Sequence, residues 1–132
     1  MKKLLSFVLS GTVLVCLNLL ACNPRSDYAR KFEIDNNSDS SVYFAINASY
    51  PDSSLRSINT APNQWQKLLP HEGKFETAGV FNYNPITVVF IFNAHTIETT
   101  PWDSVVKHYM VLMRYTLTKS DMEKNNWIIS YP

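Results

Sequence analysis

The sequence predicts one α+β domain that is mainly β, arranged as an antiparallel sheet or a small β-sandwich. Residues 86–92 (Ile-Thr-Val-Val-Phe-Ile-Phe) are almost all β-branched or aromatic, which is typical of a strand buried on both faces. We place this strand at the centre, because at an exposed edge it would promote aggregation. Other short apolar runs are separated by turns rich in Asn, Asp, Ser and Pro. Clear helix starts occur only in the C-terminal half, so we expect two short helices there.

The N-terminal half of the domain alternates between strands and turns. Residues 31–35 alternate polar and apolar side chains, as a half-buried strand does. Asn, Asp and Ser fill 36–40, and 42–46 are again apolar, so we predict that 31–46 forms a β-hairpin closed by a turn at 50–53. Residues 54–63 are predicted as irregular chain and 65–69 as a short strand. The pattern over 74–83 does not decide between helix and strand.

Two helix starts are indicated by their capping residues. Thr100 can cap, Pro101 suits the first helical position, and Asp103 can reach back to the cap. Thr118 and Asp121 repeat this arrangement. One apolar face of the first helix would consist of Trp102, Val105, Val106 and Tyr109.

Two more strands are expected near the C-terminus. Residues 110–115 read as a buried strand between the two helices. Residues 127–131 form the last strand, with Trp127, Ile129 and Tyr131 on one face. The short helices would then cover one edge of the sheet.

The N-terminus has the pattern of a secretory signal. Lys2 and Lys3 precede an apolar run over 4–20, which is too short and too interrupted for a membrane span. Residues 19–22 (Leu-Leu-Ala-Cys) resemble the bacterial lipobox. The resemblance implies cleavage between Ala21 and Cys22 and attachment of lipid, including palmitate, to Cys22. The alternative is an ordinary signal peptide with a chance cysteine at its end.

These patterns predict a lipoprotein signal peptide over 1–21, a lipidated Cys22 with a short linker over 22–30, and one globular domain over 31–132. In the lipoprotein family, Asp directly after the lipidated cysteine resembles an inner-membrane retention signal, and an acidic cluster accompanies surface export. Neither occurs here. We therefore expect a lipid-anchored cell-envelope protein at the outer membrane, facing the periplasm.

Composition excludes several classes of function. Removal of Lys2 and Lys3 with the signal leaves ten basic residues against eleven acidic ones, with no basic stripe, so a nucleic-acid partner is not expected. Cys16 is lost with the signal and Cys22 is consumed by lipid. The folded domain therefore has no disulfide, thiolate metal site or cysteine nucleophile.

Several short motifs resemble small uncharacterised lipoproteins of Bacteroides-like bacteria. They are Asn36-Asn37-Ser38-Asp39 before a Tyr-Phe strand, Tyr50-Pro51-Asp52, Pro101-Trp102-Asp103, Arg114-Tyr115, Asp121, Asn126-Trp127 and Tyr131-Pro132. The similarity covers most of 32–132. It implies an envelope location and a small β-rich fold, and it brings no activity.

No residue pattern points to catalysis, so we do not expect an enzyme, a cofactor or a metal. His71, His95 and His108 lack the spacing of a metal site. Glu33 and Asp35 would share one strand face, which solvated alternation explains better than a glycosidase pair. Asp103-Ser104-Val105 matches a loose bacterial O-glycosylation pattern, which we interpret as a chance match.

Aromatic residues are the enriched feature. Tyr50, Trp65 and Tyr83 lie in or beside predicted loops with asparagine neighbours, and aromatic rings with amide groups suit glycan or peptide binding. The same rings could instead pin loops onto a small core. Our leading hypothesis is a non-catalytic interaction or accessory module of an envelope complex. The alternative is a small glycan- or peptide-binding domain that uses these loop aromatics.

Overall fold

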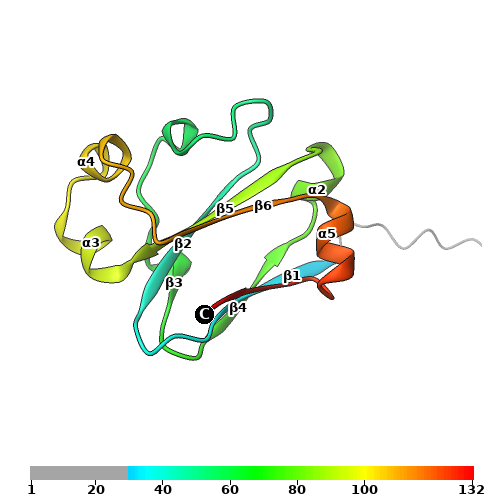
Figure 1. Cartoon of the computed structure of the whole chain (residues 1–132), viewed down its shortest axis with the longest axis horizontal. Coiled ribbons are helices and arrows are strands. Elements are labelled where there is room, and N and C mark those ends of the chain that lie inside the picture. Colours follow the sequence, from blue (N-terminus) through cyan, green and yellow to red (C-terminus); the bar gives the residue numbers. More distant parts are fainter. Residues whose placement is uncertain (1–29) are drawn as a thin grey trace, which may run out of the picture.

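The computed structural model describes residues 30–132. The predicted signal peptide, Cys22 and nearly all of the predicted linker lie outside these residues. The described part is mixed α and β but mainly β, which confirms the predicted fold class. Figure 1 shows two sheets that face each other, with short helices around them.

The two sheets share the strands unequally. The smaller sheet has the order β4-β1-β7, with bounds Gly73–Thr77, Lys31–Asn36 and Ile128–Tyr131. The larger sheet has the order β3-β2-β5-β6, with bounds Lys67–Leu68, Val42–Asn47, Thr87–Asn93 and Met113–Leu117. Neighbouring strands are antiparallel except β1 and β7, which run parallel.

Short helices occupy the connections. The α-helices are α2 (Val80–Tyr83), α3 (Ala94–Thr99), α4 (Trp102–Lys107) and α5 (Lys119–Lys124). Two 3-10 helices are η2 (Leu55–Ser57) and η3 (Gln64–Gln66). Figure 1 shows α3 and α4 at one end of the molecule and α5 at the opposite end.

Two apolar cores lie on the two faces of the larger sheet. The first fills the space between the sheets and includes Phe32 of β1, Phe44 of β2 and Val89 of β5. The second lies on the outer face and joins Phe90 and Phe92 of β5 to η2, α3 and α4. Six of the seven residues of β5 are buried, which confirms residues 86–92 as the central strand.

The predicted hairpin over 31–46 is wrong. β1 pairs with β4 and β7, whereas β2 pairs with β3 and β5 in the other sheet. The physical reason is the apolar face of each strand. Phe32 and Ile34 of β1 meet Val42 and Phe44 of β2 across the first core, so the two strands pack face to face instead of edge to edge.

The strand predicted over 110–115 begins later and is not buried. β6 starts at Met113 and forms an edge of the larger sheet. Between α4 and β6, Tyr109, Met110 and Leu112 are 53%, 39% and 47% exposed. The apolar run correctly indicated a strand. It did not indicate that this strand would pair with β5 alone and so lie at an edge of the sheet.

The helix starts were predicted with mixed success. Thr118 and Asp121 form the expected capping box of α5. Thr100 does not cap α4, which begins after Pro101, because Thr100 closes the unpredicted helix α3. α3 and α4 cover the outer face of the larger sheet and not only an edge, whereas α5 packs against the core between the sheets. In the predicted strand 65–69, the first part is 3-10 helix and only β3 is extended.

Candidate functional site

The three aromatic residues predicted to bind ligand are all exposed. Tyr50, Trp65 and Tyr83 are 52%, 85% and 67% exposed. They come from the loop after β2, from η3 and from α2. Figure 1 places β3, which directly follows η3, well apart from α2. The structure therefore does not bring Trp65 and Tyr83 into one surface.

Glu33 and Asp35 lie on one face of β1 and interact with each other, and His71 contacts Asp39 at 3.2 Å. The residues described include no group of three or more His, Cys, Asp or Glu side chains that could hold a metal ion. Ser104 of the Asp103-Ser104-Val105 motif is half-buried within α4. Burial, and then the charge of Asp35, raise the pKa of Glu33.

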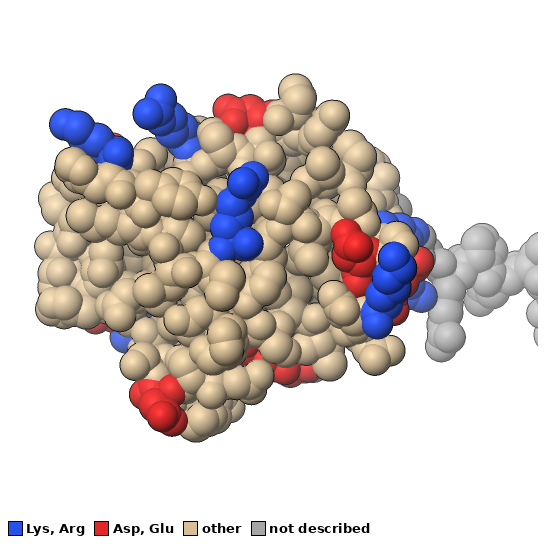
Figure 2. All heavy atoms as spheres, in the orientation of Figure 1, with Lys and Arg blue, Asp and Glu red and all other residues tan. Residues whose placement is uncertain are grey.

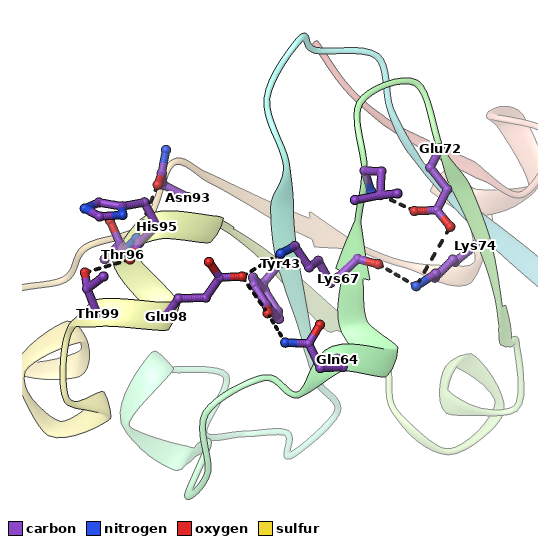
Figure 3. Close-up of polar contacts among 11 residues, drawn as sticks. Tyr43, Gln64, Lys67, Glu72, Lys74, Asn93, His95, Thr96, Glu98 and Thr99 are labelled. Atoms are coloured by element: carbon purple, nitrogen blue, oxygen red, sulfur yellow. Dashed lines mark hydrogen bonds and ion pairs between the residues drawn. The ribbon is translucent and has the colours of Figure 1, made fainter.

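A polar cluster ties α3 to the edge of the larger sheet. Figure 3 shows Tyr43, Gln64, Lys67 and Glu98 pointing toward one another. The Tyr43 hydroxyl donates to Glu98 Oε1 at 3.1 Å and accepts from Gln64 Nε2 at 2.9 Å. Lys67 Nζ donates to the same Glu98 oxygen at 2.6 Å. We call these four residues the Tyr43 cluster.

The ionisation of the Tyr43 cluster suits a structural link. Hydrogen bonds from Lys67 and Tyr43 hold the pKa of Glu98 below its ordinary value, and the bond to Glu98 raises the pKa of Lys67. Both groups are thus charged at neutral pH. A general acid or base needs a pKa near the working pH, and these shifts move both groups away from it.

A groove lies on the outer face of the larger sheet. It consists of two adjoining hollows of about 460 and 390 Å³ that share Arg56, Val106 and Lys107. One wall is the loop 51–59 with η2, and the other is α4 with Tyr109. Phe90 of β5 lies at the floor of the first hollow. We call this the outer groove.

Buried hydrogen bonds fix the loop wall of the outer groove. The side chain of Asn47, 3% exposed at the end of β2, donates to Ser54 O at 2.8 Å and to Ser57 Oγ at 2.6 Å. On the other side, Trp102 Nε1 of α4 donates to Ile58 O at 3.0 Å. The two walls are therefore joined by a bond from helix to loop.

Three cations line the first hollow of the outer groove. Arg56, Lys107 and Arg114 come from η2, α4 and β6. Among residues 30–132, the ion pairs lie elsewhere: Lys67 with Glu98, His71 with Asp39, and Lys74 with Glu72. The Arg114 guanidinium lies over the Phe90 ring at 5.9 Å. Figure 2 shows basic side chains spaced over the region where Figure 1 places α4 and β6.

One carboxylate accompanies these cations in the first hollow. Asp52 Oδ1 accepts the backbone N–H of Ser54 at 3.0 Å, and hydrogen bonds from Ser54 lower the pKa of Asp52. The hollow thus carries three positive charges and one negative charge. Asp103 lines the second hollow, at the other part of the groove.

Sequence reasoning did not find the outer groove. Of its three cations, Arg56 lies about fifty positions before Lys107 and Arg114, and the three fall in a predicted irregular segment, a predicted helix and a predicted strand. The nearest signal was the turn at 50–53, which contributes Pro51 and Asp52 to the first hollow. Tyr50 is adjacent to this wall in the sequence, so one of the three predicted aromatics lies beside the groove.

Comparison with protein-family models, curated proteins and solved structures finds no match to this chain. Within residues 30–132, no helix has the length and apolar character needed to cross a membrane.

Proposed function

We propose that this chain is a lipid-anchored cell-envelope protein that acts by binding and not by catalysis. The observation that carries this proposal is the outer groove, a hollow with an aromatic floor and two hydrogen-bonded walls. It is lined by three cations that have no ion-pair partner among residues 30–132. A volume of about 460 Å³ falls in the range of small-molecule sites, about 300–1,000 Å³. In this form the protein is a small ligand-binding domain.

The rigid support of the groove favours binding. Phe90 is fully buried on the central strand, and Asn47 holds the loop wall by several bonds. A preformed site loses less conformational entropy when a ligand enters. Among residues 30–132, no histidine lines the groove, and its two carboxylates, Asp52 and Asp103, line different hollows. This arrangement favours binding over general acid–base chemistry, which needs a positioned proton donor or acceptor.

The envelope location rests on the lipobox at residues 19–22. We expect Cys22→Ala to abolish lipid attachment and cleavage by the lipoprotein peptidase, because the cysteine sulfur is the atom that carries the lipid in bacterial lipoproteins. Labelling cells with an alkyne fatty acid measures this directly. The neighbouring change Asn23→Ala is a matched control that keeps the label. A Cys22→Ala protein that labels like wild type would contradict the anchor.

Site-specific crosslinking tests the groove as the binding site. A photoreactive phenylalanine analogue at Tyr109, which lines the first hollow, should capture the ligand in the native envelope. The same analogue at Tyr83, which is 67% exposed against 53% for Tyr109 and lies on α2, serves as the control. Capture at Tyr83 and not at Tyr109 would move the site away from the groove.

A second candidate function is docking to a larger envelope complex. It is favoured by three exposed apolar residues just before and at the start of the edge strand β6: Met110, Leu112 and Met113 are 39%, 47% and 36% exposed. Edge strands and apolar patches are frequent protein contacts. Crosslinking from Leu112 to one defined protein, with no capture from Tyr109, would favour docking over ligand binding.

A further inference from the structure

The charges of the outer groove define the chemistry of its ligand. Arg56, Lys107 and Arg114 line one hollow with a single carboxylate, that of Asp52. Like charges gathered without partners oppose folding, because each raises the electrostatic energy of the others. An anionic ligand would relieve this repulsion on binding. We propose, resting on the proposed binding function, that the groove takes an acidic sugar whose carboxylate lies among these three cations.

The cations can reach such a group from different directions. Arg56 lies on the loop wall, Lys107 on the helix wall, and Arg114 on β6. Arginine offers a planar fork that matches a carboxylate, whereas lysine acts as a compact point charge. The Arg114 guanidinium also lies over the buried ring of Phe90, which restrains its position. Together they form an anion site at one part of the groove.

The rest of the lining suits hydroxyl groups. Ser53, Ser54 and Asp52 line the first hollow, and Asn59 and Asp103 line the second. Carboxylates accept hydrogen bonds, and amides and hydroxyls both donate and accept them, so this lining can pair with sugar hydroxyls. Tyr109 adds an exposed aromatic ring on which the apolar face of a sugar can pack.

An extended peptide fits these walls less well, because their backbone groups are already used. In the loop wall, Ser57 N donates to Ser54 O and Ile58 N to Leu55 O. In the helix wall, Ser104 N donates to Pro101 O and His108 N to Ser104 O. A peptide that adds to a sheet needs a row of free backbone groups. The groove offers side chains instead, as sugar recognition requires.

Calorimetry on the full chain in detergent tests the proposal. The probes are a trisaccharide of galacturonic acid, its methyl ester and inorganic phosphate. We expect the acid to bind, the ester to bind about tenfold or more weakly, and phosphate to compete only at high concentration. Raising salt from about 50 to about 500 mM should weaken binding of the acid, because exposed charges are screened.

The double variant Arg56→Gln/Lys107→Gln should lose about tenfold or more in affinity for the acid while its melting temperature stays unchanged or rises. Lys124→Gln is the matched control, since Lys124 is an exposed cation that lines a different hollow. Equal affinity for the acid and the ester would contradict recognition of the carboxylate, without contradicting ligand binding in the groove. If the double variant binds the acid as tightly as wild type does, the acid does not bind at these cations. If neither the acid nor the ester binds, the ligand is not a sugar of this kind. Crosslinking from Tyr109 tests separately whether any ligand binds in the groove.

Discussion

Three strands end in an asparagine whose side chain organises the segment that follows. Asn36, at the end of β1, donates to Ser40 O and Leu69 O. Asn47 does the same for the groove loop, and Asn93, at the end of β5, accepts from Thr96 N to begin α3. Asn36 and Asn47 are buried, at 0% and 3% exposed. Their amides satisfy carbonyl groups that would otherwise lose their partners on burial.

Asn47→Ala should lower the free energy of unfolding by about 1–3 kcal/mol, because Ser54 O and Ser57 Oγ each lose a donor and Ser49 N loses its acceptor. The loop wall should loosen as well, so groove binding should weaken with it. Urea unfolding measures the first effect. Asn59→Ala is a matched control, since Asn59 is exposed and lines the same groove. Similar loss of stability in both variants would show that the Asn47 network carries no special weight.

Trp65→Ala should leave the melting temperature nearly unchanged, because the ring is 85% exposed on η3. Surface substitutions away from packing contacts change stability by about 0.5 kcal/mol or less. Trp102→Ala provides the contrast: its ring packs edge to face on Phe92 at 5.6 Å, and its loss should cost about 3–5 kcal/mol. Thermal melts compare the two. A strongly destabilised Trp65→Ala would mean that the exposed ring has a packing role.

At the scale of elements, β5 is the support that both cores share. Its alternate residues enter the two cores, with Val89 and Ile91 between the sheets and Phe90 and Phe92 under the helices. Its neighbours β2 and β6 pair with it along most of its length. Loss of one β5 side chain therefore disturbs one core while the strand keeps its backbone pairing.

Phe90→Ala should cost about 3–5 kcal/mol of unfolding free energy, a large share of a small domain's stability. Phe90 is fully buried and stacks on Phe92 with ring centroids 6.3 Å apart. Phe75→Ala is the matched control, because Phe75 lies on β4 and is 62% exposed. Chemical denaturation should separate them clearly. If Phe90→Ala is as stable as Phe75→Ala, β5 does not carry the core packing that we assign to it.

The elements that were predicted correctly are those whose signal is local. The apolar run of β5 and the capping box of Thr118 and Asp121 depend on neighbouring residues alone. The hairpin and the buried strand over 110–115 failed because pairing partners lie far along the chain. β1 takes its neighbours from 73–77 and 128–131, and no short pattern encodes that choice.

At the scale of the whole molecule, the candidate site shows the same limit. Exposure of Tyr50, Trp65 and Tyr83 agrees with the loop positions expected for them, but their separation depends on the sheet order. The cations of the outer groove come together only because η2 and α4 pack on the face of the larger sheet that also carries Arg114 of β6. The residues next to these cations in the sequence do not indicate that the cations cluster, so the site could be found only from the tertiary structure.

The pH dependence of unfolding reflects opposing groups spread over the molecule. The pKa of Glu98 is lowered from 4.5, first by Lys67, so its contribution to stability is present above pH 4.5 and is lost as pH falls through the folded value. Burial raises the pKa of Glu76, and burial with Asp35 raises that of Glu33. Their contributions are present below pH 4.5 and are lost as pH rises through the folded values. Hydrogen bonds from Ser54 and Thr118 lower the pKa of Asp52 and Asp121, so these two groups act in the same direction as Glu98. The loss of stability in acid is therefore the difference between the two sets of groups.

Glu98→Gln separates these effects. Wild type should be more stable than Glu98→Gln at pH 7, and the difference should shrink toward zero as the pH falls below 4.5 and Glu98 takes up its proton. Urea unfolding across this pH range measures the difference. In a Lys67→Gln background the same substitution should give a smaller and flatter difference, because the main cause of the lowered pKa is gone. A difference that stays constant with pH in the wild-type background would mean that Glu98 does not link α3 to the sheet through its charge.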